Sequence, residues 1–241
     1  MHGVYETSLR LKNKDVDLHR RLKTSRLFEL LQEASIAHTE ALGMGREKTL
    51  DRGLLWVVTL QHCEIRRMPE YDECVRVLTW PGKTMHVMFP RYYRMETESG
   101  EELLSASALW VLVDENTRRL AFPEPYGVRI EGVTTGREIS LPKTPVVSEF
   151  ASERLFSVPY SYVDLNGHMN NTRYFDLAED CLPTAAAGRK LRAVSTEYRL
   201  EVRMGEEMRV RWGNEGDSWY VSGETEKPCF RLRMDYAPEG T

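Results

Sequence analysis

The chain has 241 residues, of which 41% are hydrophobic and 29% charged, and its formal net charge is −4. That apolar share is enough for one large core or two ordinary ones, and the acidic balance does not favour nucleic acid as a partner. No apolar run approaches the length of a membrane span, and no signal-peptide pattern opens the chain. The scattered cysteines show no CxxC pair, so we expect reduced thiols, no metal, no cofactor and a cytoplasmic location.

The N-terminal half begins with a strand in which Leu9 and Leu11 alternate with polar residues. A loop that contains Asp17 follows, and then a helix is predicted from about Thr24 to Leu42. The helix has apolar residues at helical spacing: Leu27, Leu30, Leu31, Ala34, Ala37 and Ala41. Alternating patterns then predict strands over Trp56–Leu60, Cys74–Trp80, Arg91–Thr97 and Leu103–Val113.

Residues 131–149 are rich in glycine, proline and threonine, which is the composition of a linker. We therefore expect an N-terminal domain over 1–130 and a C-terminal domain over 150–241. The second domain starts with a strand at Phe156 and Val158, passes through another aspartate loop, and enters a helix near Asn171 or Thr172 that Pro183 ends or kinks. Its later strands are predicted over Ala193–Val202, Met208–Trp212, Trp219–Glu224 and Cys229–Tyr236.

The two halves are a sequence repeat. When Val16 is written above Val163, the register holds for 18 positions without a gap and gives six identities. Both halves then continue with one helix and four strands, the pattern of an α+β fold in which a sheet wraps a helix. The alternative is coincidental similarity within one large α+β domain.

A dense polar cluster precedes the second helix. Asp164, Asn166 and His168 occupy alternate positions of one short turn. Histidine is suited to proton transfer near neutral pH, while the amide and the carboxylate suit positioning of a carbonyl, a water or the imidazole. These residue types are also common in turns that have no catalytic role.

The first repeat helps to decide between these readings. It keeps the aspartate as Asp17, but His19 matches Asn166 and Arg21 matches His168. A turn needed only for folding has no reason to carry the Asn-x-His pair in one copy alone. We therefore expect one active site, in the second half.

These residues resemble the signature of the acyl-ACP thioesterases, a family of plant plastid enzymes with shorter bacterial relatives. The segment Asp164–Tyr174 has the spacing Asp-x-Asn-x-His-x-Asn-Asn-x-x-Tyr. Other segments that resemble the family extend over nearly the whole chain: 31–43, Leu55–Thr59, Trp110–Val111, Thr117–Leu120 and Glu197–Glu201. Plant members carry a transit peptide that this sequence does not show, so we expect a member of the bacterial type.

The resemblance implies a tandem hotdog fold, in which each unit is an antiparallel sheet wrapped around one central helix. It also implies hydrolysis of fatty acyl-ACP to free fatty acid and holo-ACP, with acyl carrier protein as the partner. Asp164, Asn166 and His168 take the signature positions, and Glu201 takes the position of a catalytic carboxylate. Because the second hotdog is supplied in cis, we expect a monomer.

The sequence departs from plant members directly after Glu201, where they have a cysteine and this chain has Val202. Valine cannot attack a thioester, and Cys181 lies about three helical turns beyond His168 on an apolar helix. We therefore expect direct attack by water, activated by Glu201 or His168; the sequence does not divide the work between them. Glu197 is expected on the same strand, either as a supporting carboxylate or in a salt bridge with an arginine.

The first hotdog is implied to shape the pocket for the acyl chain. Candidate wall residues are Leu30, Leu31, Ala34 and Ala37 on the helix and Trp56 and Val58 on the next strand. Because acyl carrier protein is acidic, arginines and lysines near the pocket mouth should dock it. The candidates are Arg189, Lys190 and Arg192, with Arg20, Arg21 and Lys23 as the alternative patch.

Three other functions are compatible with the resemblance to hotdog proteins. An acyl-CoA thioesterase would act on the same bond from a different carrier. A hydratase or dehydratase would act on the β-carbon of the acyl chain, and a binding protein would sequester the chain without turnover.

Overall fold

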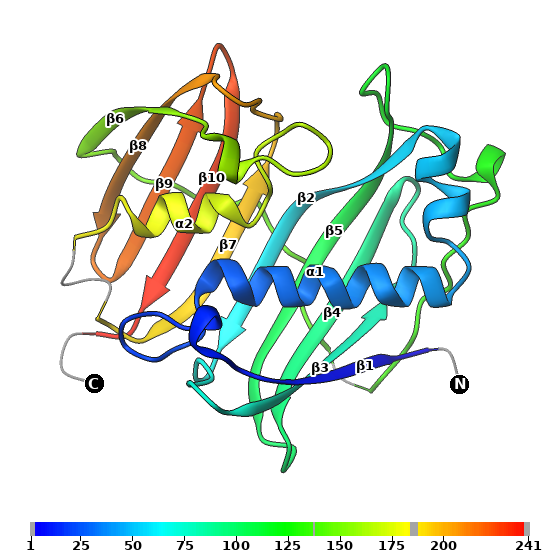
Figure 1. Ribbon diagram of the computed structural model, residues 1–241, viewed down its shortest axis with the longest axis horizontal. Helices are drawn as coiled ribbons and strands as arrows, with labels where there is room; N and C mark the ends of the chain where they lie inside the picture. The colour runs from blue at the N-terminus through cyan, green and yellow to red at the C-terminus, as the bar shows by residue number, and fades with distance from the viewer. Residues whose placement is uncertain (1–2, 137, 184–187, 239–241) are drawn as a thin grey trace.

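The computed structural model describes residues 3–136, 138–183 and 188–238, which form one curved sheet and two helices (Figure 1). The first half contains β1 (Tyr5–Arg10), α1 (Thr24–Ala41), β2 (Leu54–Ile65), β3 (Cys74–Pro81), β4 (Met88–Thr97) and β5 (Glu102–Asp114). The second half contains β6 (Ser152–Ser157), α2 (Arg173–Glu179), β7 (Leu191–Tyr198), β8 (Glu207–Glu215), β9 (Ser218–Glu224) and β10 (Pro228–Tyr236). Short 3-10 turns occur at Asn13–Asp15, Arg46–Lys48, Leu50–Arg52, Glu124–Tyr126 and Tyr160–Tyr162.

The described strands form a single ten-stranded antiparallel sheet in the order β1-β3-β4-β5-β2-β7-β10-β9-β8-β6. The two halves join where β2 pairs with β7, in a register that sets Leu60 opposite Glu197 and Glu64 opposite Ala193. Each half is a hotdog unit, and the α+β tandem hotdog predicted from the sequence is confirmed.

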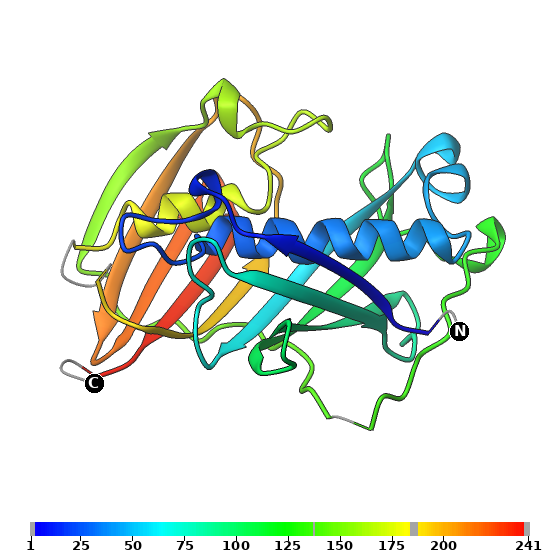
Figure 2. The ribbon, with the colours of Figure 1, turned by 60° about the horizontal axis from the view of Figure 1, so that its bottom comes forward.

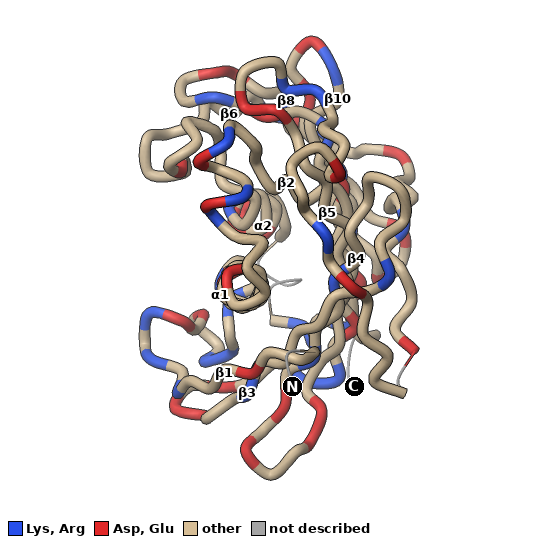
Figure 3. The backbone as a smooth tube through the Cα atoms, turned by 90° about the vertical axis from the view of Figure 1, so that its right-hand side faces the viewer, with Lys and Arg blue, Asp and Glu red and all other residues tan. Residues whose placement is uncertain are grey.

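Both helices lie on the concave side of the sheet. Figure 2 shows the strands curving around α1, and Figure 3 shows the sheet passing from β6 through β5 and β4 to β1 around both helices. The α1 residues Leu27, Leu31 and Ala34 are buried, whereas Ile36 on another face is 54% exposed. The helical spacing of apolar residues therefore decides which face of α1 meets the sheet.

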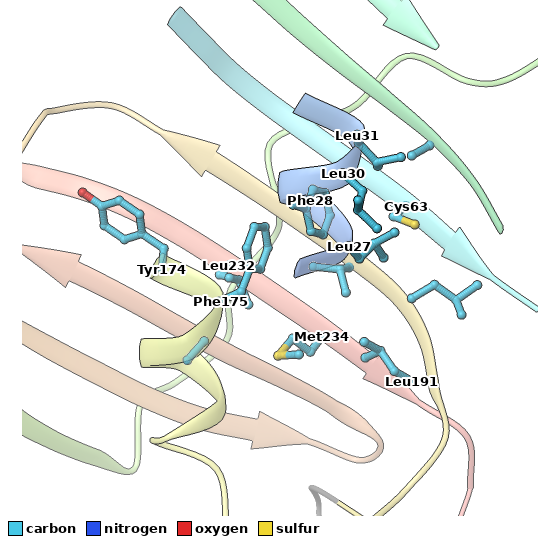
Figure 4. Close-up of a cluster of buried hydrophobic side chains, with 14 of the residues drawn as sticks. Leu27, Phe28, Leu30, Leu31, Cys63, Tyr174, Phe175, Leu191, Leu232 and Met234 are labelled. Carbon is cyan, nitrogen blue, oxygen red and sulfur yellow. The ribbon is translucent and has the colours of Figure 1, made fainter. Parts of the chain in front are cut away.

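The two helices meet at the centre of the core. Phe28 of α1 stacks on Phe175 of α2, with ring centroids 4.1 Å apart and an interplanar angle of 9°. Figure 4 shows the pair between leucines of α1 and the side chains of Leu232 and Met234 from β10. The two phenylalanines occupy equivalent positions of the sequence repeat, so this contact joins matching residues of the two halves.

Two predicted elements end earlier than expected. The second helix stops at Glu179 and therefore ends before Pro183 is reached. The strand predicted to reach Val202 stops at Tyr198, because the backbone N–H groups of Arg199 and Leu200 both donate to the Cys229 carbonyl and leave the regular ladder. Among the described residues, no helix has the length and apolar character needed to cross a membrane.

Candidate active site

The loop before α2 is held by its own aspartate. One carboxylate oxygen of Asp164 accepts the backbone N–H of Asn166 at 2.9 Å, and the other accepts the side-chain amide of Asn170 at 3.2 Å. The Asp164 N–H donates to the His168 carbonyl at 3.0 Å, and Gly167 sits in the left-handed region with φ of 79°. The carboxylate of Asp164 thus fixes the turn from which the histidine projects.

His168 faces the predicted catalytic carboxylate. Its Nε2 atom lies 3.1 Å from Oε2 of Glu201. His168 is only 7% exposed, while the Glu201 side chain is 38% exposed. This arrangement places a buried imidazole against a carboxylate that water can reach, which is suited to general acid–base chemistry.

Backbone pairing brings these two residues together although Glu201 lies outside any strand. His168 forms an isolated bridge with Arg203, and the Met169 N–H donates to the Val202 carbonyl at 2.8 Å. Val202 is fully buried. The position at which plant members carry cysteine therefore serves here to hold the loop by its carbonyl group.

A third charged residue completes the cluster and comes from the N-terminal repeat. Arg118 Nη1 lies 3.4 Å from Oε1 of Glu201, and its Nη2 lies 3.4 Å from Nε2 of His168. In the sequence, Arg118 is marked only as part of the segment Thr117–Leu120 that resembles the family. The paired arginines of that segment were the available signal, but nothing local indicated that this loop reaches across to the second repeat.

The turn that presents Arg118 is tightly built. The Asp114 carboxylate accepts the backbone N–H groups of Thr117 and Asn116 at 2.7 and 3.1 Å, and these bonds hold the pKa of Asp114 below its ordinary value. The Arg118 N–H donates to the Asp114 carbonyl at 2.9 Å. Arg118 itself has φ of 57°, a left-handed conformation that is uncommon outside glycine. A non-glycine residue in this conformation is a reason to look for a functional constraint.

Asn166 lies on the wall of a cavity of about 300 Å³. The cavity runs between the loop before α2 and the C-terminal half of α1, where Ile36 and Thr39 line it, and its far side includes Trp56 and Phe89. We call it the Asn166 cavity. It combines an apolar wall with a few polar groups, as binding sites for small apolar ligands do, and Leu165 and Asn166 of the loop that carries His168 belong to its lining.

The structure places the predicted wall residues as follows. Trp56 lines the Asn166 cavity. Leu30, Leu31, Ala34 and Val58 are instead packed in the main core, and Ala37 does not line the cavity either. The α1 residues that line the cavity are Ser35, Ile36, Thr39 and Glu40, whereas the leucines of the helix pack in the core.

The predicted docking residues do not lie at the mouth of the Asn166 cavity. Arg189, Lys190 and Arg192 stand at the start of β7, whereas Glu201 follows its other end, and eight strand residues span about 26 Å. In Figure 1 the loop before α2 (yellow-green) lies near that other end of β7. The structure joins the two alternative patches instead, because Arg21 Nη1 donates to the Arg189 carbonyl at 2.8 Å.

The remaining predicted residues have structural contacts. Glu197 forms an ion pair with Arg199 at 2.8 Å and accepts a hydrogen bond from Thr144, so the salt-bridge alternative is the observed one. Cys181 is buried in the core, and burial raises the pKa of its thiol above the ordinary value. A thiol in that environment is a poor nucleophile.

The chain was compared with known proteins. Models of the acyl-ACP thioesterase N-terminal and C-terminal domains match residues 2–125 and 147–230. An acyl-[acyl-carrier-protein] hydrolase of Cuphea viscosissima is 26% identical over 83% of this chain and 52% of that protein. A palmitoyl-acyl carrier protein thioesterase of Arabidopsis thaliana is 24% identical over 82% of this chain and 52% of that protein. The chain therefore spans about half the length of the curated relatives it matches.

Solved structures share the fold along the whole chain. An acyl-ACP thioesterase from Bacteroides thetaiotaomicron superposes with a TM-score of 0.85, at 20% identity and 97% and 98% coverage of the two chains. The 12:0-ACP thioesterase from Umbellularia californica gives a TM-score of 0.81, at 21% identity and 98% coverage of both. These similarities establish the tandem hotdog arrangement.

Proposed function

The chain belongs to the acyl-ACP thioesterase family, and from this we propose that it hydrolyses the thioester of a fatty acyl group carried on acyl carrier protein. The observation that carries the proposal is the contact of His168 with Glu201 next to the Asn166 cavity. Hydrolysis of a long acyl thioester requires an acid–base pair close to an apolar cavity, and here the loop that carries His168 also lines the cavity through Leu165 and Asn166.

We propose direct attack by water. Glu201 is the more exposed partner, so it accepts the proton of a water whose oxygen attacks the thioester carbonyl carbon. The carbon–sulfur bond of the resulting tetrahedral adduct then breaks. The proton that Glu201 took from the water passes to the imidazole of His168, which in turn protonates the leaving thiolate, so that the products are a free fatty acid and the thiol of the carrier and both side chains return to their starting states. Asn166 has a side-chain amide at the cavity wall, where it can donate to the carbonyl oxygen.

Arg118 supports this scheme from the first repeat. Its guanidinium contacts both Glu201 and His168, so it holds the two groups in position relative to each other. Asp164 acts indirectly, since its carboxylate is used to hold the loop. The first repeat therefore contributes to the chemistry as well as to chain binding.

The acyl chain is proposed to enter the Asn166 cavity. Ile36, Trp56 and Phe89 provide apolar surface there, with the rings of Trp56 and Phe89 packed edge to face at 4.8 Å. Both repeats belong to one continuous sheet through β2 and β7, which supports a functional monomer.

The carrier must deliver its thioester to Glu201. Docking on Arg189, Lys190 and Arg192 would place the carrier at the far end of β7. Arg119 is exposed and follows Arg118 in the chain. Arg203 is also exposed and forms the backbone bridge with His168. We therefore propose that the carrier docks on this side, at Arg119 and Arg203. Charge reversal at Arg119 and Arg203 should raise the KM for acyl-ACP, whereas charge reversal at Arg189, Lys190 and Arg192 should not.

The decisive experiment is an assay of the full chain on saturated acyl-ACP and acyl-CoA of matched lengths, with free fatty acid as the readout. Faster release from the ACP substrates supports the proposal, and preference for CoA would favour the alternative carrier. A hydratase or dehydratase releases no acid from a saturated thioester. Stoichiometric binding without release would identify a sequestering protein.

A further inference from the structure

A second cavity, of about 560 Å³, lies beside the Asp17 loop at the start of β7. Asp17, His19 and Arg21 line it from the first repeat, and Glu179 lines it from α2. We call it the Asp17 cavity. The proposed reaction does not use it.

The Asp17 cavity is the repeat counterpart of the Asn166 cavity. Each cavity lies between the aspartate loop of one repeat and the C-terminal part of the helix of the other. In one case Asn166 lies across from Ile36 of α1, and in the other His19 lies across from Glu179 of α2. The duplicated fold has therefore kept a hollow at both positions.

Hydrogen bonds define which residues correspond. In the first repeat the Leu22 N–H donates to the Pro69 carbonyl at 2.8 Å, and in the second the equivalent bond is made to the Val202 carbonyl, also at 2.8 Å. The residues before these two acceptors are Met68 and Glu201. The catalytic carboxylate is thus replaced by a thioether.

The histidine is replaced as well. Arg21 stands where the second repeat has His168, and its guanidinium is bound to Asp17 at 3.1 Å. A guanidinium does not exchange protons near neutral pH, so the Asp17 cavity has lost both groups of the acid–base pair. What remains is a hollow with a fixed positive charge.

The lining of the Asp17 cavity is positive although the chain is negative. Seven lysine or arginine residues line it against four aspartate or glutamate residues. Lys23 and Arg192 donate to backbone carbonyl oxygens at 3.4 and 3.1 Å. Lys190 is exposed. Among the described residues, none of these three cations pairs with a carboxylate, which leaves their charge uncompensated. Burial also raises the pKa of Glu179 to about 7, so one of the four acids is partly neutral at physiological pH.

The same cavity has an apolar side formed by Leu22, Met68, Leu182, Leu191 and Tyr236. A ligand that satisfies both parts carries one anionic group and a hydrocarbon chain. We propose that the Asp17 cavity binds a long-chain carboxylate without hydrolysing anything, with its head group near Lys23 and Lys190 and its chain against the apolar side.

This inference goes beyond the proposed function, because it assigns a second ligand site to the repeat that has lost catalysis. A carboxylate bound there leaves the Asn166 cavity open. Free fatty acid should therefore occupy two sites on the wild-type chain, at opposite ends of β7.

The test is isothermal titration of the full chain with decanoate below its micelle concentration. In the double variant Lys23→Glu/Lys190→Glu, the affinity of the Asp17 cavity for decanoate should fall at least tenfold, so that only one of the two sites is still filled. The rate of acyl-thioester hydrolysis should stay at the wild-type value. Lys143→Glu/Lys227→Glu changes the net charge equally at residues outside both cavities and should keep both sites. Decan-1-ol, which lacks the charge, should not fill the Asp17 cavity.

Equal decanoate binding in the two double variants would overturn the proposal, as would equal binding of decan-1-ol. A raised KM for acyl-ACP in Lys23→Glu/Lys190→Glu, with decanoate binding intact, would assign the patch to carrier docking instead. Absence of hydrolysis in every chain would refute the proposed function but would leave the count of decanoate sites unchanged.

Discussion

The loops that contain Asp17 and Asp164 share a backbone and differ in chemistry. In each loop the aspartate carboxylate accepts the backbone N–H of the residue two positions later, at 2.8 Å for Asp17 and 2.9 Å for Asp164. In each, the residue three positions later is left-handed, with φ of 63° at Arg20 and 79° at Gly167. The aspartate is thus retained in both copies because it forms the turn.

The difference lies in the residue that each turn presents. Arg21 folds back onto Asp17 and onto the Arg189 carbonyl, where it fastens the loop to the start of β7. His168 instead points at Glu201 and receives a further contact from Arg118. The two loops therefore keep the same turn, and the residue four positions after the aspartate decides which contacts each loop makes.

The largest expected effect comes from removing the acid–base pair. His168→Ala or Glu201→Gln should lower kcat on saturated acyl-ACP by about 10²-fold or more, because each removes a positioned proton-transfer group. His19→Ala changes an exposed residue of the first loop and should leave kcat unchanged. Steady-state kinetics with circular dichroism as a folding control would make the comparison. Activity within a few-fold of wild type in both His168 and Glu201 variants would remove the pair from the mechanism.

Arg118 tests the contribution of the first repeat. Arg118→Gln should lower kcat by about tenfold, since a charge-assisted contact to Glu201 and His168 is lost. Arg119→Gln, at an exposed neighbour, is the matched control and should have little effect. Arg118→Lys keeps the charge and should recover part of the rate. A role limited to stability would lower the melting temperature without changing the pH profile of kcat, and that result would contradict our assignment.

The two faces of α1 should respond differently to enlargement. Ile36→Trp fills the Asn166 cavity, and because each excluded methylene costs about 0.8 kcal/mol, loss of two should shift chain-length preference by roughly tenfold towards shorter acyl groups. Ala34→Phe overpacks a site that is 2% exposed and should cost about 1–3 kcal/mol of stability. A panel of acyl-ACP lengths and thermal unfolding measure the two effects. A uniform loss of rate on every chain length in Ile36→Trp would place the acyl chain elsewhere.

The smallest effect concerns stability and pH at Glu179. Burial, together with Asp176, Asp17 and Asp180, raises its pKa to about 7 despite a hydrogen bond from Thr24. Between about pH 4.5 and 7, Glu179 therefore keeps its proton in the folded state but loses it in the unfolded state. Stability should fall as pH rises from about 4.5 to 7 and stay low above that range.

Glu179→Gln removes this titration and places in α2 the residue type that α1 has at the matching position, Gln32. At pH 8 the variant should be more stable by on the order of 1 kcal/mol, after allowance for partial exposure. Urea unfolding at pH 5 and pH 8 measures the difference. An equal pH dependence in both proteins would show that Glu179 ionises normally.

The sequence pattern predicted the α+β repeat, and the family resemblance predicted the tandem hotdog. Apolar spacing predicted α1 to within one residue at each end, because helical periodicity over many residues is a strong signal. The sequence pattern was less successful in predicting the end of β7, the strand after α2. No glycine, proline, asparagine or aspartate interrupts Ala193–Val202 in the sequence, yet the strand ends at Tyr198, where the hydrogen bonds to the Cys229 carbonyl leave the ladder. The acceptor lies on another strand, so no local pattern could reveal it.

The residues of the candidate site divide in the same way. The identity of His168 and its neighbours was visible because they are close in sequence and differ from the first repeat. The addition of Arg118 and the choice of α1 face depended on how distant segments pack. Arg118, in the turn after β5, contacts His168 in the loop before α2 and Glu201 after β7, which lie 50 and 83 positions further along the chain. Local periodicity and turn chemistry determine which elements form, but only the packing of the two repeats decides which side chains meet, because that depends on the register across β2 and β7.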